Sequence, residues 1–293
     1  MIYFLRENTL FIRGNFKGAS TGVRGGIANV STIFNHTVPK SFSHTEPHRY
    51  MKSVVAEQGF STEDFFGLLT AVEMKTLCVF SYEFITVFIT AGVSNPNPDG
   101  PGTINIIIHS REGLSDGALL EMVITATEAK AQALHDMGYD FTGTTTDAVV
   151  AVYEDNKIVH EYAGTLTEAG KRVYECVRSG LPEALRRHEG IIETDRESFF
   201  VLSTIGGNHW VEWKKEECPY YPCHFEGQRC DFCYCPFYPC KDRELGDWID
   251  SSTGKKVWSC QRCRLIHYPE VVDYLKRKPE ASLRELKALA VKK

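Results

Sequence analysis

The placement of the cysteines constrains this chain more than any other feature. Eight of the ten lie in the 46 residues from Cys218 to Cys263, and only Cys78 and Cys176 precede them. The chain starts with neither the basic segment nor the long apolar segment of a signal peptide, so we expect a cytoplasmic protein. Because a cytoplasmic protein rarely keeps disulfides, the cluster predicts metal ligands rather than a disulfide framework.

The cysteine cluster contains two nearly identical loops and two short knuckles. The loops are Cys218-Pro-Tyr-Tyr-Pro-Cys223 and Cys235-Pro-Phe-Tyr-Pro-Cys240, and the knuckles are Cys230-x-x-Cys233 and Cys260-x-x-Cys263. Proline restricts each loop, so each can present two thiolates at low entropic cost. We predict two metal sites of four cysteines each, one pairing the two loops and the other pairing the two knuckles.

Zinc is the expected metal, because tetrahedral thiolate sites suit it. The ions would be structural, since protein ligands fill every position. An iron–sulfur cluster is the alternative. His224 and His267 could each replace a cysteine, although ordinary surface histidines are the simpler interpretation. We therefore expect residues 206–293 to form a small domain stabilised by two ions, after a larger domain of residues 1–205.

Charge is distributed unevenly between the two ends of the chain. Residues 1–210 carry 17 Lys and Arg against 25 Asp and Glu, whereas residues 211–293 carry 16 against 13. An acidic larger domain argues against nucleic-acid binding, and the basic tail leaves only a weak case for a protein or nucleic-acid adaptor. No apolar run approaches the ~20 residues that span a bilayer.

The larger domain alternates β-branched segments with segments of helical periodicity, which predicts an α/β or α+β fold with a mixed β-sheet and packed helices. Strands are expected at 3–5, 10–13, 27–34, 77–82, 84–90, 103–109, 148–153, 157–162 and 199–205, with the strands at 148–153 and 157–162 forming a hairpin. Glycines from position 14 onward are expected to interrupt the second strand. Helices are expected at 47–59, after residue 61, at 114–137 and from 167 to 188, the last broken or kinked near Pro182, with two short helices in 269–293. Thr45, Ser115 and Ser282 are the expected N-caps.

A small residue followed by glycine and threonine occurs three times beside an expected strand or helix start. The three corners are Pro101-Gly102-Thr103, Thr142-Gly143-Thr144 and Ala163-Gly164-Thr165. Glycine lets a backbone approach a ligand closely and threonine supplies a hydroxyl. Each corner alone could be an ordinary turn, but together they predict a site for a large polar ligand. Asn29, His36 and Asn105 are further polar residues at expected strand ends.

The standard nucleophile motifs are absent, because the sequence has no G-x-S-x-G, H-E-x-x-H or Walker A pattern. Cys78 and Cys176 lie in apolar surroundings, which is typical of core residues. A carboxylate, a threonine or a bound metal therefore remains for catalysis. Glu128 lies among small residues of the longest expected helix, although a solvated charged face fits its spacing equally well. Asp147 follows three threonines and could orient a water or a hydroxyl, or cap a turn.

Several motifs, in unbroken order over about residues 10–190, together resemble those of adenosylcobinamide amidohydrolases. They are Gly25-Gly26, Asn35-His36-Thr37-Val38, Thr90-Ala91-Gly92-Val93-Ser94-Asn95, Gly102-Thr103-Ile104-Asn105, Thr127-Glu128-Ala129-Lys130, Thr142-Gly143-Thr144-x-Thr146-Asp147 and Ala163-Gly164-Thr165. Thr145 departs from the glycine that is more usual in that family. The tail resembles a small cysteine-rich domain, found mostly in archaeal proteins, that is sometimes fused to this enzyme.

The resemblance implies hydrolysis of the amide that joins aminopropanol to the corrin ring of adenosylcobinamide. The products would be adenosylcobyric acid and 1-amino-2-propanol, in corrinoid salvage toward coenzyme B12. A non-catalytic corrinoid carrier or sensor that uses the same pocket is the alternative.

The family pattern does not identify a nucleophile, and the chemistry of amide hydrolysis leads to a hypothesis for the roles of individual residues. In this hypothesis Glu128 activates water, with Lys130 or His36 as proton donor or electrostatic partner, and Asp147 assists. Asn105 and backbone N–H groups near Gly143 would stabilise the oxyanion. The implied substrate-binding residues are Asn29, Asn95, Gly102, Thr103, Asn105, Gly143, Thr144, Gly164 and Thr165.

Overall fold

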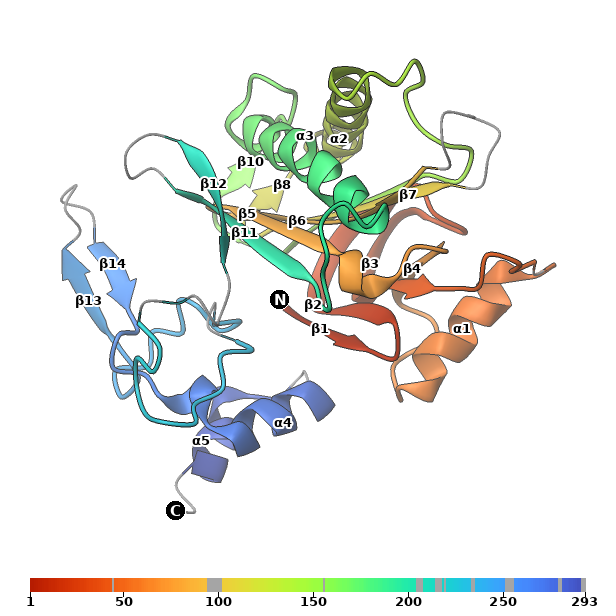
Figure 1. Cartoon of the computed structure of the whole chain (residues 1–293). Helices are drawn as coiled ribbons and strands as arrows, with labels where there is room; N and C mark the ends of the chain where they lie inside the picture. The colour runs from red at the N-terminus through yellow and green to blue at the C-terminus, as the bar shows by residue number, and fades with distance from the viewer. Residues whose placement is uncertain are drawn as a thin grey trace. The chain divides into compact units, whose positions relative to one another are not determined.

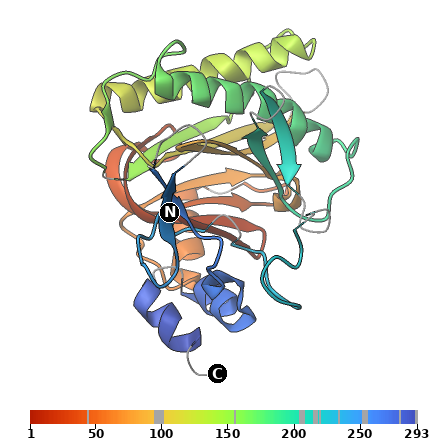
Figure 2. The same cartoon turned by 90° about the vertical axis from the view of Figure 1, so that its left-hand side faces the viewer.

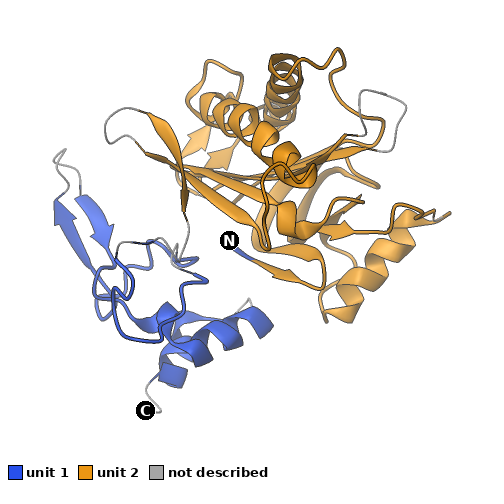
Figure 3. Cartoon of the chain, in the orientation of Figure 1, with its two compact units in different colours: residues 1–3, 214–293 blue, residues 4–213 orange. Residues whose placement is uncertain are grey.

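The chain forms two compact units, which Figure 3 shows in separate colours. Residues Phe4–Trp213 make up the main unit, and Met1–Tyr3 with Lys214–Lys293 make up the cysteine-rich unit. This computed structural model describes residues 1–43, 45–93, 102–154, 156–203, 208–213, 218, 220–232, 235–250, 256–278 and 281–290. Two predicted site residues, Asn95 and Cys233, lie outside the described residues.

Within the described residues, the main unit is built on a ten-stranded mixed sheet in the order β12-β11-β5-β6-β7-β9-β2-β3-β4, with β1 paired to β2 (Figure 1). The strands are β1 (Ile2–Arg6), β2 (Thr9–Ser20), β3 (Gly26–Thr37), β4 (Phe65–Thr70), β5 (Cys78–Tyr82), β6 (Ile85–Gly92), β7 (Thr103–Ser110), β9 (Ala148–Glu154), β11 (Ser198–Ser203) and β12 (His209–Trp213). The pairs β3–β4, β7–β9 and β5–β11 are parallel, and the other paired strands run antiparallel. The predicted mixed sheet is confirmed.

Two long helices, α2 (Asp116–Asp136) and α3 (Glu168–His188), lie side by side over one face of the sheet (Figures 1 and 2). The Ser115 hydroxyl accepts a hydrogen bond from the Ala118 N–H, so the predicted N-cap is confirmed. Alanines on α2 and apolar residues of β6 and β7 share one buried core, because small side chains let the helix approach the sheet closely. Both core cysteines predicted from the sequence, Cys78 and Cys176, lie in it.

The shorter elements flank this core. They are α1 (Pro47–Glu57), η1 (Met74–Thr76), β8 (Gly113–Leu114) and β10 (Val159–His160). Helix α1 lies where the sequence predicts it, and Gly59 follows it with φ of +74°. Thr45 is not its N-cap, because Glu46 takes that position and makes no side-chain capping bond. The tight turn between β1 and β2 has Glu7 and Asn8 at positive φ, as a two-residue hairpin turn requires.

Several sequence-based expectations are wrong. The short helix expected after residue 61 is replaced by β4, whose partner β3 lies some 30 residues earlier in the chain. Strand β10 does not form a hairpin with β9, because it pairs in parallel with β8. Strand β2 continues through Gly14 and Gly18, with a register shift between Arg13 and Phe16. At Gly18 a side chain is excluded, because a Cβ there would lie 2.5 Å from Val152 Cγ1.

The expected break in the last long helix is also wrong, since α3 continues through Pro182. Proline removes one backbone hydrogen bond and crowds the preceding turn. Packing against the sheet compensates, because Gly180 in the same turn lies close to Phe80 and Ile89, and a Cβ there would lie within 3 Å of both side chains.

The cysteine-rich unit contains a hairpin, β13 (Asp247–Asp250) and β14 (Lys256–Ser259), and the elements η2 (Leu265–His267), α4 (Pro269–Arg277) and α5 (Leu283–Ala290). Two short helices in this region were predicted and are confirmed. The predicted Ser282 cap is confirmed as well, because its hydroxyl accepts from Glu285 N–H while the Glu285 carboxylate accepts from Ser282 N–H. None of the described helices has the length and apolar character that crossing a membrane demands.

The two glycines in the first turns of α2 and α3 test this packing. A Cβ at Gly170 would overlap the carbonyl oxygens of Gly164 and Ala163, whereas a Cβ at Gly117 would meet only Ser115 Oγ, 3.7 Å away. We expect Gly170→Ala to lower the free energy of unfolding by about 1–3 kcal/mol, because backbone atoms must move to make room. Gly117→Ala is the control and is expected to change it by less than about 0.5 kcal/mol. Urea unfolding followed by circular dichroism measures both, and equal stability of the two variants would contradict the close approach.

Candidate active site

The Asp147 carboxylate joins three segments of the main unit just before β9 begins. It accepts hydrogen bonds from Lys130 Nζ at 2.5 Å, from Ile104 N at 2.8 Å and from Thr144 N at 3.0 Å. The Thr144 hydroxyl donates a fourth bond of 2.6 Å. The side chains of Lys130 and Asp147 are only 9% and 10% exposed, so this ion pair is nearly buried. Helix α2, the start of β7 and the threonine turn are therefore held together by one carboxylate.

Gly143 makes room for this ion pair. A Cβ at position 143 would overlap Asp147 Oδ2 and would lie 2.5 Å from Lys130 Nζ. The predicted Thr142-Gly143-Thr144 corner thus has a specific reason for its glycine, which is the close approach of two charged side chains to the backbone. Lys130 and Asp147 are two of the four predicted catalytic residues, and the structure brings them together.

A second corner, Gly102-Thr103, meets the first. The Thr146 hydroxyl donates to Gly102 O at 2.9 Å, and the Thr144 hydroxyl oxygen, whose one proton Asp147 accepts, lies 2.8 Å from the same carbonyl oxygen. The Thr103 and Thr146 hydroxyls lie 2.8 Å apart. Thr146 is exposed and Thr103 partly exposed, so these hydroxyls reach solvent at the rim of the site. The structure places two of the three predicted corners in contact.

The third corner lies beside the first half of α2 and caps α3. Ala163 N donates to the Glu121 carboxylate, and Ala163 O accepts from the Thr125 hydroxyl. Gly164 O accepts from the Thr167 N–H and hydroxyl. These bonds hold Gly164 and the neighbouring Thr165 just before the start of α3. No contact between either residue and the Asp147 cluster is seen among the described residues.

A buried amide network lies between β3, β4, β6 and β7. The Asn105 amide donates to Asn35 Oδ1 at 3.0 Å and to Leu69 O at 3.1 Å, and Asn35 donates to the Thr90 hydroxyl at 2.8 Å. Both N–H groups of Asn105 are thus engaged, and the residue is 1% exposed. This arrangement does not favour the predicted contact of Asn105 with an oxyanion, since no N–H remains to donate.

The other predicted residues lie apart from the Asp147 cluster. Glu128 is exposed on α2, two positions before buried Lys130, so the two side chains leave opposite sides of the helix. His36 has both ring nitrogens engaged, with the Thr9 hydroxyl at 2.6 Å and the Tyr50 hydroxyl at 2.9 Å. Asn29 is exposed on β3. The catalytic assignments of Glu128 and His36 remain predictions.

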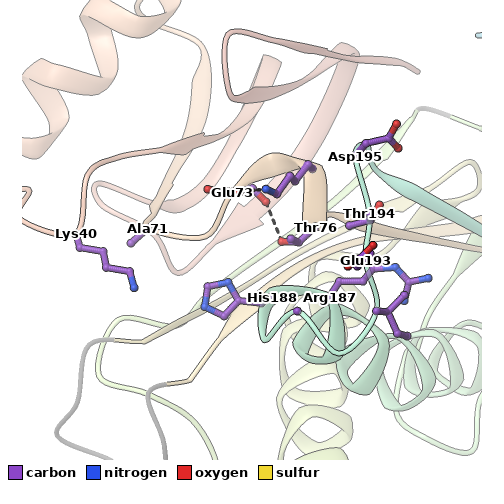
Figure 4. Close-up of a pocket in the computed structure, with 12 residues that line it drawn as sticks. Lys40, Ala71, Glu73, Thr76, Arg187, His188, Glu193, Thr194 and Asp195 are labelled. Carbon is purple, nitrogen blue, oxygen red and sulfur yellow. Dashed lines mark hydrogen bonds and ion pairs between the residues drawn. The ribbon is translucent and has the colours of Figure 1, made fainter.

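A cavity of about 750 Å³ opens where β4, η1 and the end of α3 meet (Figure 4). It is lined by Lys40, Ala71, Glu73, Lys75, Thr76, Arg187, His188, Gly190, Ile192, Glu193, Thr194 and Asp195. Its wall contacts the β6–β7 region, because a Cβ at Gly92 would lie 2.7 Å from His188 Nε2. No sequence pattern predicted this cavity. The glycine at position 92, within the Thr90–Asn95 motif, was the one available indication, because it packs against the cavity residue His188.

The core cysteines are chemically inert at neutral pH. Burial raises the pKa of Cys78 to about 12 and the pKa of Cys176 well above its usual value. A thiol attacks carbonyl carbon as its thiolate, which is scarce under these conditions. Both residues are therefore structural, as the sequence analysis expects.

The cysteine-rich unit gathers its sulfurs in two neighbourhoods. Burial raises the pKa of Cys235 to about 12, with further contributions in the same direction from Cys263, Cys260 and Cys240, so these three sulfurs lie within electrostatic range of Cys235. Elsewhere, the buried Gln228 amide lies 3.3 Å from both Cys223 Sγ and Cys230 Sγ. These contacts associate a loop cysteine with knuckle cysteines, unlike the predicted pairing of loop with loop and knuckle with knuckle, and the ligand grouping stays a prediction. Among the described residues, which leave out Cys233, no three His, Cys, Asp or Glu side chains converge as a metal site.

The Lys130–Asp147 ion pair supplies a stability test. Lys130→Met leaves a nearly buried carboxylate without its cation, so we expect the free energy of unfolding to fall by about 3–5 kcal/mol. Adding Asp147→Asn to that variant removes the charge and is expected to recover part of the loss. Lys17→Met breaks the exposed Lys17–Asp116 ion pair and serves as a control, with an expected loss below about 1 kcal/mol. Equal losses in Lys130→Met and Lys17→Met, measured by urea unfolding, would show that the Asp147 cluster is not held by charge.

Comparison with known proteins gives two matches along the chain. The profile of the adenosylcobinamide amidohydrolase family matches residues 8–193, and that of a cysteine-rich small domain matches residues 209–290. An adenosylcobinamide amidohydrolase of Methanosarcina mazei is 43% identical over 196 residues, which are 63% of this chain and 98% of that protein. A second, from Halobacterium salinarum, is 32% identical over 182 residues, which are 57% of this chain and 78% of that protein.

A short match adds a third relative. A Methanothermobacter thermautotrophicus protein named as a probable cobalt-factor III C(17)-methyltransferase is 54% identical over 63 residues, which are 21% of this chain and 17% of that protein. The family profile covers the Asp147 cluster and the cavity-lining residues as far as Glu193, and the profile of the small domain covers the sulfur neighbourhoods. The chain belongs to the adenosylcobinamide amidohydrolase family and carries a cysteine-rich small domain after the family region.

Proposed function

We propose that the main unit hydrolyses the amide that joins aminopropanol to the corrin ring of adenosylcobinamide. Water adds to the carbonyl carbon and the C–N bond breaks, which yields adenosylcobyric acid and 1-amino-2-propanol. Membership of the family over residues 8–193 and the names of the two long-matching relatives support this assignment. The reaction would return a corrinoid precursor to coenzyme B12 synthesis.

One observation carries the proposal furthest. The motifs that resemble the family lie far apart in sequence, yet Lys130, Gly143, Asp147 and the Gly102-Thr103 corner form one hydrogen-bonded cluster. This cluster stands beside a cavity of about 750 Å³, within the size range of about 300–1,000 Å³ that is usual for small-molecule sites. A cluster that served the fold alone would not need partly exposed threonine hydroxyls at its rim.

The groups of the cluster have separate tasks in this proposal. Asp147 and Lys130 hold the threonine corner in place, because every strong acceptor position of the carboxylate already has a donor. The Thr103 and Thr146 hydroxyls bind polar groups of the substrate side chain. Positioning of this kind places the amide carbonyl and the attacking water within reach of each other.

The direct test of the function is product release. Purified protein incubated with adenosylcobinamide is expected to release 1-amino-2-propanol and adenosylcobyric acid in equal amounts, which mass spectrometry quantifies. Binding of the corrinoid without release of the amino alcohol would instead favour a carrier or sensor.

The role of Glu128 is tested in the same assay. Because Glu128 is exposed on the side of α2 away from Lys130, we expect Glu128→Gln to keep a rate within a few-fold of the wild-type rate. Loss of a catalytic base costs about 10²–10⁴-fold in rate. A loss of that size would identify Glu128 as the base and would contradict the expectation drawn from its placement.

We also propose that the cysteine-rich unit binds two structural zinc ions. The donor set fits, since six of the described cysteines lie in two neighbourhoods, the chain supplies eight in this unit, and thiolates are preferred zinc ligands. Cys235, Cys240, Cys260 and Cys263 would hold one ion, and Cys218, Cys223, Cys230 and Cys233 the other. The Gln228 N–H group near two sulfurs would donate to thiolates, as outer groups do at zinc sites. Such ions supply folding energy to a unit with a small core.

Paired serine substitutions distinguish this ligand grouping from the one expected from the sequence. We expect the wild-type chain to hold about two zinc ions, the Cys235→Ser/Cys260→Ser variant about one, and the Cys230→Ser/Cys260→Ser variant none, because each site needs four thiolates. Plasma emission spectrometry of the purified proteins measures the content. The reverse pattern in the two variants would restore the loop-with-loop pairing, and iron in place of zinc would exclude a zinc site.

A further inference from the structure

We propose that His188 transfers the proton in this hydrolysis, and that the cavity it lines receives the aminopropanol side chain of the substrate. This inference rests on the proposed function. Neither the sequence motifs nor the hypothesis about Glu128 includes this residue, which lies at the end of α3, about 60 residues beyond Glu128.

The imidazole of His188 is placed for reaction with a ligand. It lines the cavity together with Glu73 and Lys40, which face the same space from other segments (Figure 4). No described residue forms a hydrogen bond with either ring nitrogen. The ring therefore keeps one donor and one acceptor for water or substrate.

The other described histidines of the main unit that are partly or fully buried lie against protein groups, and His48 among them stacks on the Phe65 ring. His36 bonds Thr9 and Tyr50. His109 is fully buried with its Nε2 3.3 Å from the Glu154 carboxylate, and His160 lies 2.7 Å from the Glu112 carboxylate. Their ring positions follow from structural partners, whereas His188 faces a cavity.

Two glycines connect His188 with the Asp147 cluster. A Cβ at Gly92 would lie 2.7 Å from His188 Nε2, so the imidazole ring packs directly on the last residue of β6. A Cβ at Gly102 would lie 2.8 Å from Gly92 O and 3.1 Å from Thr144 Cγ2. Among the described residues, the backbone of these two glycines therefore lies between the imidazole and the threonine corner.

The charges around His188 keep it neutral. Burial and the nearby Lys40 ammonium lower the pKa of the imidazole, and Glu73 and Glu189 act against them more weakly. The remaining charged groups of the cavity are Lys75, Arg187, Glu193 and Asp195. Since an unperturbed histidine has a pKa of about 6.5, the ring is in its basic form at neutral pH.

A neutral imidazole can carry both proton transfers of the reaction. It takes a proton from water as the oxygen attacks the carbonyl carbon, and the imidazolium then gives that proton to the nitrogen as the C–N bond breaks. The amine departs neutral and is protonated by solvent, while the new carboxylic acid loses its proton to solvent. Atoms and charge balance without a further reactant.

The substitution His188→Gln tests the role, with His135→Gln on the exposed face of α2 as the matched control. We expect kcat of His188→Gln to fall about 10²–10⁴-fold with a smaller change in KM, and His135→Gln to keep the wild-type rate. If His188→Gln is unfolded by circular dichroism, His188→Asn takes its place. A folded variant with wild-type kcat would overturn the inference.

The pH profile gives a readout that a structural role would not move. Wild-type kcat/KM is expected to fall on the acid side as the imidazole becomes protonated. Lys40→Gln removes a positive charge and is expected to move this acid limb to higher pH, whereas Glu73→Gln is expected to move it to lower pH. An acid limb that stays in place in both variants would show that His188 is not the titrating group.

The outcomes separate this inference from the proposed function. Wild-type protein that releases no 1-amino-2-propanol refutes the function itself. Active wild-type protein whose rate and acid limb survive in His188→Gln refutes only the role of His188, and leaves the hydrolase assignment in place.

Discussion

The Asp147 carboxylate is the interaction on which the active-site region depends. A nearly buried charge is costly unless it is paired and hydrogen-bonded, and Asp147 meets both conditions through Lys130, two backbone N–H groups and a hydroxyl. Its partners come from α2, from the first residues of β7 and from the turn before β9. The ion pair therefore decides how the threonine corner faces the cavity, and Gly143 is the condition for its formation.

Sheet topology explains why these residues meet. Strands β6 and β7 are antiparallel and β7 and β9 are parallel. The last residue of β6 and the first residues of β7 and β9 therefore lie at the same end of these neighbouring strands. The sequence shows glycines and threonines at the ends of these strands, and local signals such as the Ser115 and Ser282 caps were sufficient to locate several elements. Strand β4 was misassigned as a helix, and β10 was predicted as a strand but with the wrong partner. Both elements pair with strands distant in sequence, β3 and β8, and strand propensity responds strongly to such context.

The sulfur neighbourhoods show a different limit of sequence reasoning. The similar sequences of the Cys218–Cys223 and Cys235–Cys240 loops led to the prediction that the two loops share one metal site. Similarity of sequence, however, does not determine which loops lie together in space. The structure combines the Cys235–Cys240 loop with the Cys260–Cys263 knuckle, while Gln228, a residue without a motif, contacts Cys223 and Cys230. His188 was missed for a related reason, since its position in the last turn of a helix resembles an ordinary basic residue near a helix end.

Polar groups that have hydrogen-bond partners within the protein and polar groups that lack them have different roles in the main unit. Asp147, Asn35 and the N–H groups of Asn105 form hydrogen bonds with neighbouring protein groups, and such groups hold positions well but exchange protons with a substrate poorly. Catalysis needs the opposite, a titratable group that is partly desolvated, has no competing protein partner and faces a cavity. The two roles are compatible in this site. The rigid threonine corner can orient the amide, while the imidazole of His188 moves the proton. The same reasoning explains why the residues that the motifs single out and the residue that performs the proton transfer need not coincide.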